Sequence, residues 1–450
     1  MVSRHFTIVL MGTLYIDTGG NAQNSGCTDQ NAANLSGTAA TVAGSVVTLD
    51  GSPDLSGLIT SGATQSSIYI NDATNANMKI FWITAFDNGA KTVTVHAAPT
   101  GVVSSTWKIG GRHVLTNATI EGAVRAGDTV IFNNSPASGT GTRWTFRNAG
   151  DSTSGPCKIM GKTGVRPVLN TTNAATALSI ATALCHVENL EIISGALAIN
   201  APSAGWTLVN VKVSSAGTNC LTSTNSGRAI GCEFYGATNH GCAFTGTVGS
   251  LLSECYIHDN TQNGILISGL TSMMLSNCII DSNGLQGVYV SGAHTAANAL
   301  RITLKNCTVY GNGDSGLEVT DADANVILQN NIFQDNGNAA GEYNVEWVAG
   351  AAEYIGYHSN NCFYKSANNL FGLTANSTET TSDPLLTNPA SGDFTLAYGS
   401  PCKATGTPGT ILGTSTGYAD MGAIQRLEGA GAPASGGGGR QQHLGPILMG

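Results

Sequence analysis

The chain has 450 residues, of which only 10% are charged and 6% aromatic, with 58 glycines and a formal net charge of −9. An ordinary soluble domain carries about 25% charged residues, so much of the polar surface must come from Ser, Thr, Asn and Gly, which are poor residues for helix interiors. This composition favours a strand-rich chain. The lack of a basic run argues against a nucleic-acid partner, and no apolar stretch approaches the roughly 20 residues that span a membrane.

Residues 1–111 contain strand-like runs but no repeat. The run "KIFWITAFDNGAKTVTVHAAP" predicts a hairpin around "DNGA". We therefore expect a β-rich N-terminal domain or cap. The first 20 residues carry little charge and a short apolar run, but no convincing small-residue cleavage site follows, so we expect no cleaved signal peptide.

From about residue 112 to 381 a short pattern recurs, with a step of 23 residues between Cys232, Cys255 and Cys278. Repeats of this length indicate a solenoid, and runs such as "GILIS" and "GVYVS" alternate with the period of a strand. Successive coils should then stack about 4.8 Å apart. The longer step after Cys278 predicts a loop insertion at "SGAHTAANAL". We expect an inward column of cysteines: Cys232, Cys255, Cys278, Cys307 and Cys362.

Asparagines recur beside the cysteines and again five positions after them. Asparagine tolerates left-handed backbone geometry, which suits bends, and stacked amides can bond along a column. The sequence therefore predicts two sets of asparagine turns. The first is Asn189, Asn210, Asn277, Asn306, Asn330 and Asn361, and the second is Asn260, Asn283, Asn312 and Asn336.

The eleven cysteines and other chemical motifs indicate no metal or nucleotide site. There is no C-x-x-C pair and no zinc-type Cys/His spacing, and stacked parallel side chains are poorly aimed for disulfides, so we expect reduced cysteines and a reducing compartment. The run "GPCKIMGKTG" resembles a phosphate loop, but Pro156 stands where the loop needs glycine. We expect no cofactor, no metal and no identifiable catalytic residue.

The repeat resembles the right-handed parallel β-helix (pectate-lyase-like) superfamily, the fold of pectate lyases and many phage tailspikes. The opening "LYIDTGGNAQNSG" and the closing "SDPLLTNPASGDFTLAYGSPCKATG" resemble the ends of such proteins. The resemblance implies an all-β parallel solenoid. The expected organisation is an N-terminal β-rich domain at 1–111, coils at 112–381, a C-terminal cap at 382–425 and a Gly-rich tail with an apolar tip at 426–450.

Outward positions carry the candidate carbohydrate contacts. In-register stacking predicts an outward column of Tyr235, His258, Asp281, Tyr310 and Gln334, and a second strand places Tyr289 and Glu318 outward. Aromatic rings would stack on sugars and carboxylates would bond their hydroxyls; the alternative is a solvated sheet face on which Tyr is a good strand former. The candidates are Tyr235, Tyr256, His258, Asp281, Tyr289, Tyr310 and Glu318.

Three functions stay open on this sequence. The first is a non-enzymatic structural or adhesive component of a tailed-phage virion, either a capsid decoration (cement) protein or a tail spike. The resemblance implies a homotrimer that binds other virion proteins, contacts a host polysaccharide and assembles in the host cytoplasm. The second is a polysaccharide lyase or glycoside hydrolase, which compact carboxylate clusters would favour. The third is a secreted or cell-surface bacterial adhesin.

Overall fold

The computed structural model describes residues 12–425 with gaps. The gaps are 17–34, 63, 76–77, 103, 111–120, 137, 139–141, 172–175, 216, 247–248, 270–271, 293–300, 322–323, 338, 340, 349–356, 365–368 and 411–415. The predicted tail at 426–450, most of the loop insertion at "SGAHTAANAL" and most of the first 34 residues lie outside the described residues.

The chain forms two compact units, Met1–Gly195 with Ser203–Thr207, and Ala196–Pro202 with Leu208–Gly450. The described residues are almost entirely strands and turns, with 3₁₀ turns at η1 (Glu121–Ala123) and η3 (Pro389–Ser391). Among them, no helix has the length and apolar character needed to cross a bilayer. The all-β prediction is confirmed, whereas the domain boundaries at 111, 381 and 425 stay predictions.

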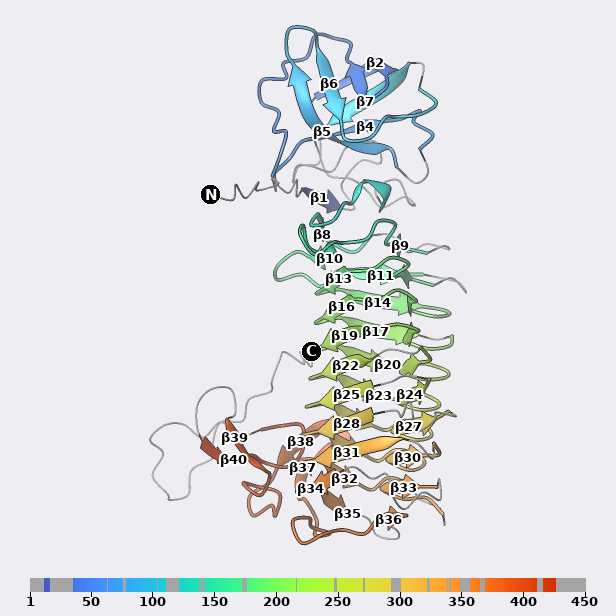
Figure 1. Cartoon of the computed structure of the whole chain (residues 1–450), viewed down its shortest axis with the longest axis vertical. Helices are drawn as coiled ribbons and strands as arrows, with labels where there is room; N and C mark the ends of the chain where they lie inside the picture. The colour runs from blue at the N-terminus through green and yellow to red at the C-terminus, as the bar shows by residue number, and fades with distance from the viewer. Residues whose placement is uncertain are drawn as a thin grey trace, which may run out of the picture. The chain divides into compact units, whose positions relative to one another are not determined.

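In the first unit, residues 35–109 form a closed barrel of six strands (Figure 1). The predicted hairpin around "DNGA" joins β5 to β6. The barrel interior is apolar and includes Phe81 and Trp107, both fully buried. In barrel order the strands are β2 (Leu35–Ala43), β3 (Val46–Thr48), β6 (Thr92–Val95), β5 (Ile80–Asp87), β4 (Ser67–Ile70) and β7 (Ser105–Ile109).

The solenoid begins before the barrel in the sequence. Strand β1 (Thr13–Ile16) pairs in parallel with β8 (Thr129–Phe132), so the barrel is inserted between two neighbouring rungs. Strand β8 in turn pairs with β10 (Cys157–Gly161), which pairs with β13 (Cys185–Glu188). The other coil strands of this unit are β9 (Trp144–Thr145), β11 (Val168–Asn170), β12 (Leu178–Ser179) and β14 (Glu191–Ser194).

A buried ion pair ties these rungs to the barrel sequence. The Asp128 carboxylate accepts hydrogen bonds from the backbone N–H of Gly12 at 2.6 Å and from Arg125 Nε at 3.0 Å. The Arg125 guanidinium also lies over the Trp82 ring, 4.6 Å from its centroid, and donates to Gln65. Because Asp128 is fully buried, these donors are what keep its charge tolerable there.

The second unit stacks its coils as three parallel sheets (Figure 1), and β16 (Trp206–Val209) lies across the division between the units. In this unit the first sheet contains β19 (Gly227–Ile230), β22 (Ser250–Ser253), β25 (Ser272–Ser276), β28 (Arg301–Lys305), β31 (Asn325–Gln329) and β34 (Tyr357–Ser359). The second sheet contains β17 (Lys212–Ser215), β20 (Glu233–Tyr235), β23 (Tyr256–His258), β26 (Ile279–Asp281), β29 (Thr308–Tyr310), β32 (Ile332–Gln334) and β35 (Cys362–Tyr364). The third sheet contains β15 (Ile199–Ala201), β18 (Leu221–Ser223), β21 (Cys242–Phe244), β24 (Ile265–Ser268), β27 (Val288–Ser291), β30 (Leu317–Val319), β33 (Val345–Trp347) and β36 (Leu370–Phe371).

The first set of predicted asparagine turns mostly has the expected left-handed backbone. The φ angle is +52° at Asn189 and Asn210, +54° at Asn277, +52° at Asn306 and +59° at Asn330. At the next coil the residue with left-handed geometry is Asn360, with φ +54°, so the prediction of a turn at Asn361 is wrong by one residue.

The same one-residue slip corrects the prediction for Cys362. The side chains of Asn331 and Asn361 stack on each other and bond at 3.0 Å, and Cys362 pairs in register with Ile332 instead. Because alternate residues of a strand point to opposite faces, Cys362 leaves the inward column. The other predicted members, Cys232, Cys255, Cys278 and Cys307, are buried on consecutive coils, and all ten described cysteines are free.

The second set of asparagines forms a buried ladder. Asn260 donates to Asn283, Asn283 to Asn312 and Asn312 to Asn336, at 2.8–2.9 Å. The left-handed residue of each of these turns precedes the ladder asparagine, as at Asp259 and Ser282. These asparagines therefore serve as ladder members rather than as the left-handed residues themselves.

The closing segment folds back along the side of the solenoid. It contains β37 (Leu386–Asn388), η3, β38 (Asp393–Leu396), β39 (Pro408–Thr410) and β40 (Thr416–Tyr418). Leu396, Cys402 and Met421 pack on Ile332 and Cys362, which explains how Cys362 is buried on the outer side. The closing segment therefore covers the outer face of the last second-sheet strands.

A charge placed in the inward column tests the solenoid. Cys278→Asp should cost several kcal/mol and prevent folding, because the carboxylate would be buried without a partner. The check is soluble yield and far-ultraviolet circular dichroism. Cys278→Ala is the matched control and should still fold, with a loss of about 1–2 kcal/mol for the smaller side chain. Normal folding of the aspartate variant would contradict the inward placement.

Candidate functional site

The second sheet brings five of the seven predicted contact residues together on its outer face. Its strands stack in the predicted register, with Tyr235 opposite His258, His258 opposite Asp281 and Asp281 opposite Tyr310. Two positions earlier on each strand, a parallel column runs through Lys212, Glu233, Tyr256 and Ile279. We call Lys212, Glu233, Tyr235, Tyr256, His258, Asp259 and Asp281 the histidine cluster.

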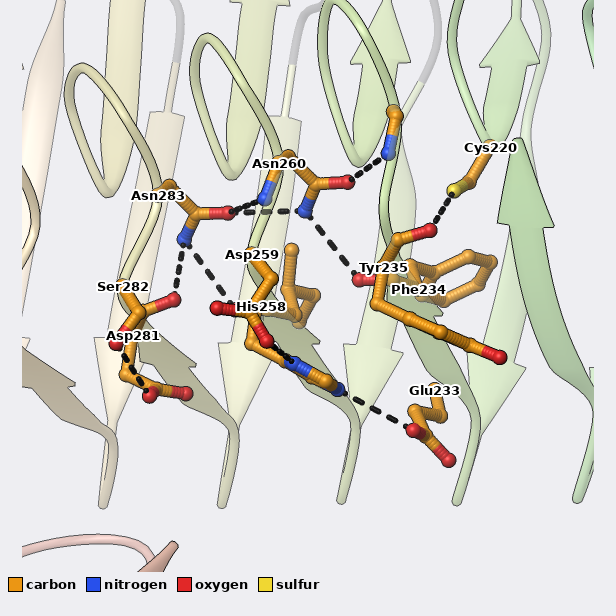
Figure 2. A network of polar contacts seen from close by, with 12 residues as sticks. Cys220, Glu233, Phe234, Tyr235, His258, Asp259, Asn260, Asp281, Ser282 and Asn283 are labelled. Atoms are coloured by element: carbon orange, nitrogen blue, oxygen red, sulfur yellow. Dashed lines mark hydrogen bonds and ion pairs between the residues drawn. The ribbon is translucent and has the colours of Figure 1, made fainter. Parts of the chain in front are cut away.

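The His258 imidazole lies at the centre of this cluster, between two carboxylates (Figure 2). Its Nε2 lies 3.2 Å from Glu233 Oε1, and its Nδ1 lies 2.8 Å from Asp259 Oδ2. The ammonium of Lys212 lies 3.2 Å from the same Glu233 oxygen. The lysine ammonium and the imidazole therefore converge on one carboxylate, which fixes the orientation of Glu233.

Aromatic rings fix the histidine from both sides. The Tyr235 ring stacks on His258 at 5.3 Å between centroids, and the Tyr256 ring stacks on it at 3.9 Å. The Lys212 ammonium lies over the Tyr235 ring, 4.7 Å from its centroid. His258 and Lys212 therefore lie against the Tyr235 ring, and His258 stacks on the Tyr256 ring, which leaves less ring surface for stacking on sugars than the sequence suggested. The hydroxyls and ring edges of the two tyrosines are what a ligand could contact.

The cluster shifts the protonation equilibria of Glu233 and His258 toward a charged pair. Burial disfavours the charge on both, but the hydrogen bond from His258 and the Lys212 ammonium outweigh it and hold the pKa of Glu233 below its usual value. Likewise, hydrogen bonds to Glu233 and Asp259 outweigh burial and raise the pKa of His258. The partly exposed surface of the cluster thus presents fixed opposite charges.

The pKa of Asp281 is shifted in the opposite direction to that of Glu233. Asp281 is 5% exposed, and its Oδ1 has no hydrogen-bond partner among the described residues, while Oδ2 accepts from the Ser282 hydroxyl. Burial raises the pKa of Asp281 to about 6, against opposing effects of His258, Ser282 and Tyr256. Burial and the nearby Asp281 charge also raise the pKa of Tyr256. The cluster therefore holds two carboxyls whose pKa values are shifted in opposite directions, Glu233 downward and Asp281 upward.

Tyr310 and Asp281 are not on a solvated face, contrary to the expected outward exposure of their column. Asp281 is 5% exposed, and the closing segment packs on Tyr310 and Tyr256: Phe394 lies edge-on to Tyr310 at 5.8 Å and to Tyr256 at 6.4 Å. Phe394 also forms one apolar cluster with Ile279 and Ala423. Only the part of the face around Tyr235, Glu233 and Lys212 stays beside this cover rather than beneath it.

The third sheet holds the other two predicted residues, away from the histidine cluster. Tyr289 lies opposite Glu318, and Glu318 lies opposite Glu346. Carboxylate oxygens of Asp314, Glu318 and Glu346 lie within 4.8 Å of one another, close enough to share a cation, and we call these three the acidic cluster. The Gln286 amide donates to Asp314 and Glu318, and the Ser315 hydroxyl donates to Glu346.

Sequence reasoning missed Lys212, Glu233 and Asp259 as members of one site. The signal was present, because Glu233 and Tyr256 are each two positions before a residue of the predicted column and must share its face. Asp259 differs: as the left-handed turn residue, with φ +52°, it leaves the strand and reaches back to His258. Strand periodicity cannot predict that contact.

The Asp281 carboxyl gives a pH-dependent prediction. Its folded-state pKa of about 6 lies above the ordinary 3.8, so protonation stabilises the fold below about pH 4 and that contribution is lost as the pH rises through 6. Asp281→Asn should gain up to about 3 kcal/mol over the native chain between about pH 4 and pH 8. Urea unfolding of both proteins at several pH values measures this. If the difference in unfolding free energy between the two proteins does not vary with pH, the raised pKa of the buried Asp281 carboxyl would be contradicted.

Comparisons with known proteins agree with this fold. Residues 195–363 match a family described as "Right handed beta helix region". Pectate lyase Pel9A superposes with a TM-score of 0.56 at 14% identity, covering 70% of this chain and 92% of the lyase. The tailspike protein gp49 of Acinetobacter baumannii bacteriophage Fri1, a capsular polysaccharide depolymerase, has a TM-score of 0.36 at 10% identity, covering 74% and 76%.

The Azotobacter vinelandii mannuronan C-5 epimerase AlgE6 A-module has a TM-score of 0.38 at 13% identity, covering 57% of this chain and 83% of the module. No curated protein matches the sequence. The likeness to the lyase shows the fold and not an activity, and the other two scores are too low to bear on either. The predicted fold is confirmed: the chain folds as a right-handed parallel β-helix.

Proposed function

We propose that this protein binds a polysaccharide along the outer face of its second sheet, through the histidine cluster. The observation that carries the proposal is the fixed array of partly exposed polar groups around His258. Lys212, Glu233 and His258 hold one another in place, so little conformational entropy is lost when they bond sugar hydroxyls or charged substituents. The groups lie on three successive strands of the sheet, β17, β20 and β23, which suits a ligand that extends across several coils.

We further propose that the protein acts as a structural or adhesive component of a tailed-phage virion, as a tail spike or capsid decoration protein, and works as a homotrimer. The inserted barrel at 35–109 is an element beyond the solenoid that could attach to other virion proteins. The ten buried free cysteines suit assembly in a reducing host cytoplasm. A host-surface glycan is then the polymer that the histidine cluster would contact.

A second candidate function is cleavage of the bound glycan. Carboxylates are clustered at two places, around His258 and around Glu318, and such clusters could supply the acid and base of a glycan-cleaving enzyme. Glu233 is held ionised, whereas the pKa of Asp281 is raised to about 6. Carboxyls whose pKa values are pushed apart are the usual pattern of a base and an acid. However, Asp281 is 5% exposed beneath the closing segment, which makes binding the better-supported function.

Glycan binding can be tested on a panel of bacterial capsular and O-antigen polysaccharides. We expect Glu233→Gln to weaken binding about tenfold or more, a loss of at least about 1.4 kcal/mol, because Lys212 and His258 lose the charge that orients them. Tyr235→Phe should weaken binding less, through its hydroxyl alone. Tyr398→Phe, at a tyrosine that is 97% exposed elsewhere, is the control. Equal binding by all variants would remove the histidine cluster from the function, and release of glycan fragments would favour cleavage.

The virion setting has a separate test in the copy number of this chain per particle, by quantitative mass spectrometry of purified phage. We expect the chain to be present. A ratio near one copy per shell subunit, or a regular fraction of it, assigns a capsid decoration protein, and a few tens of copies assign a tail spike. Absence from particles would overturn the virion proposal and leave glycan binding by a free protein.

A further inference from the structure

The first sheet carries a partly exposed apolar and basic stripe on its outer face, which the closing segment touches at Gln329 through Thr407. One outward column runs through Leu251, Met274, Thr303, Ile327 and Tyr357 on successive coils. Met274 is 41% and Tyr357 52% exposed. Arg301 and Lys305 flank Thr303 on β28, and neither forms an ion pair among the described residues. Exposed apolar groups in a row, rimmed by charge, mark an interaction surface.

The third sheet carries a matching stripe with the opposite charge. Its outward column runs through Leu266, Tyr289, Glu318, Glu346 and Phe371, again on successive coils. Phe371 is 47% exposed. Burial and the neighbouring Glu346 and Asp314 charges raise the pKa of Glu318, against the opposing Gln286 hydrogen bond. A cation from outside the chain would relieve this repulsion.

The two stripes match on four of their five coils, the exception being the coil that holds Ile327 and Glu346. Leu251 and Leu266 belong to one coil, Met274 and Tyr289 to the next, and Tyr357 and Phe371 to the last of the series. Between these apolar levels, the basic residues of β28 share a coil with the acidic residues on and beside β30. These pairs cannot meet within one chain, because the two sheets face outward in different directions around the coil.

We propose that the first-sheet stripe of one copy packs against the third-sheet stripe of a second copy, with their solenoid axes parallel and their coils at the same level. A rotation axis parallel to the solenoids preserves the level of every residue, so the apolar groups of three coils meet and Arg301 and Lys305 meet Asp314 and Glu318. A contact between two different surfaces closes into a ring when the rotation is a whole fraction of a turn, as in the proposed trimer. This inference rests on the proposed oligomer and assigns the surfaces that hold it.

Charge reversal with rescue tests this interface on the full chain. Light scattering after size exclusion should show a closed oligomer for the native protein. The double variant Arg301→Glu, Lys305→Glu should dissociate it, and so should Asp314→Lys, Glu318→Lys, each weakening assembly about 100-fold or more. The quadruple variant should assemble again, because the reversed stripes match once more. Lys91→Glu with Lys108→Glu, on the barrel, changes the net charge equally and should leave the mass unchanged.

Cross-linking supplies a residue-level measurement. A chain carrying Met274→Cys and Tyr289→Cys should form covalent multimers with a short bis-maleimide, whereas Met274→Cys alone should not. Circular dichroism of each variant separates dissociation from misfolding. A native protein that is monomeric at about 100 μM, or a quadruple variant that stays dissociated, would overturn the proposal. So would a mass that falls on calcium chelation but ignores the Arg301 and Lys305 changes, because the acidic cluster would then bind an ion.

The polysaccharide test separates the two proposals. A monomeric native protein that loses glycan binding through Glu233→Gln would remove this interface and keep the proposed function. An oligomer that dissociates in the double variants and reassembles in the quadruple variant, but binds no glycan, would keep this interface and remove the proposed function.

Discussion

The structure depends on turning the chain at the same point of every coil. Each turn between the first and second sheets needs one residue with positive φ, a geometry that costs most side chains about 1 kcal/mol or more. Asparagine occupies it at Asn277, Asn306 and Asn330, and glycine at Gly231. Stacked asparagines also bond to one another, as Asn330 does to Asn306 at 3.1 Å. The residue that permits the bend therefore also joins it to the next coil.

Buried polar columns then impose the register that the apolar core alone would leave loose. In the ladder, Asn283 both donates to Asn312 and accepts from Asn260, so a coil shifted by one residue would leave amides unpaired in the interior. Asn331 shows the same logic, since it takes a cysteine position and bonds onward to Asn361. Specificity of stacking thus comes from hydrogen bonds, and much of the stability comes from the apolar residues between them.

Local periodicity was enough to predict the all-β solenoid, the β5–β6 hairpin and the outward register from Tyr235 to Tyr310, because coils contact only their neighbours. It failed where the period changed, at Asn361 and Cys362, where a one-residue slip reversed the faces. It also failed for Tyr310, on which Phe394 packs from more than 80 residues away in the chain. The meeting of Lys212, Glu233 and Asp259 at His258 needed side-chain reach as well as register.

The coil-to-coil ladder makes the length of the solenoid adjustable. Asn283 and Asn312 each bond to the ladder asparagines of the coil before and the coil after, and the spacing from Cys232 to Cys255 equals that from Cys255 to Cys278. Duplicating one such 23-residue segment would add a rung about 4.8 Å thick whose hydrogen bonds are already provided by its copies. Segmental duplication would therefore lengthen the solenoid by one coil at a time, and each added coil would keep the same order of inward and outward residues.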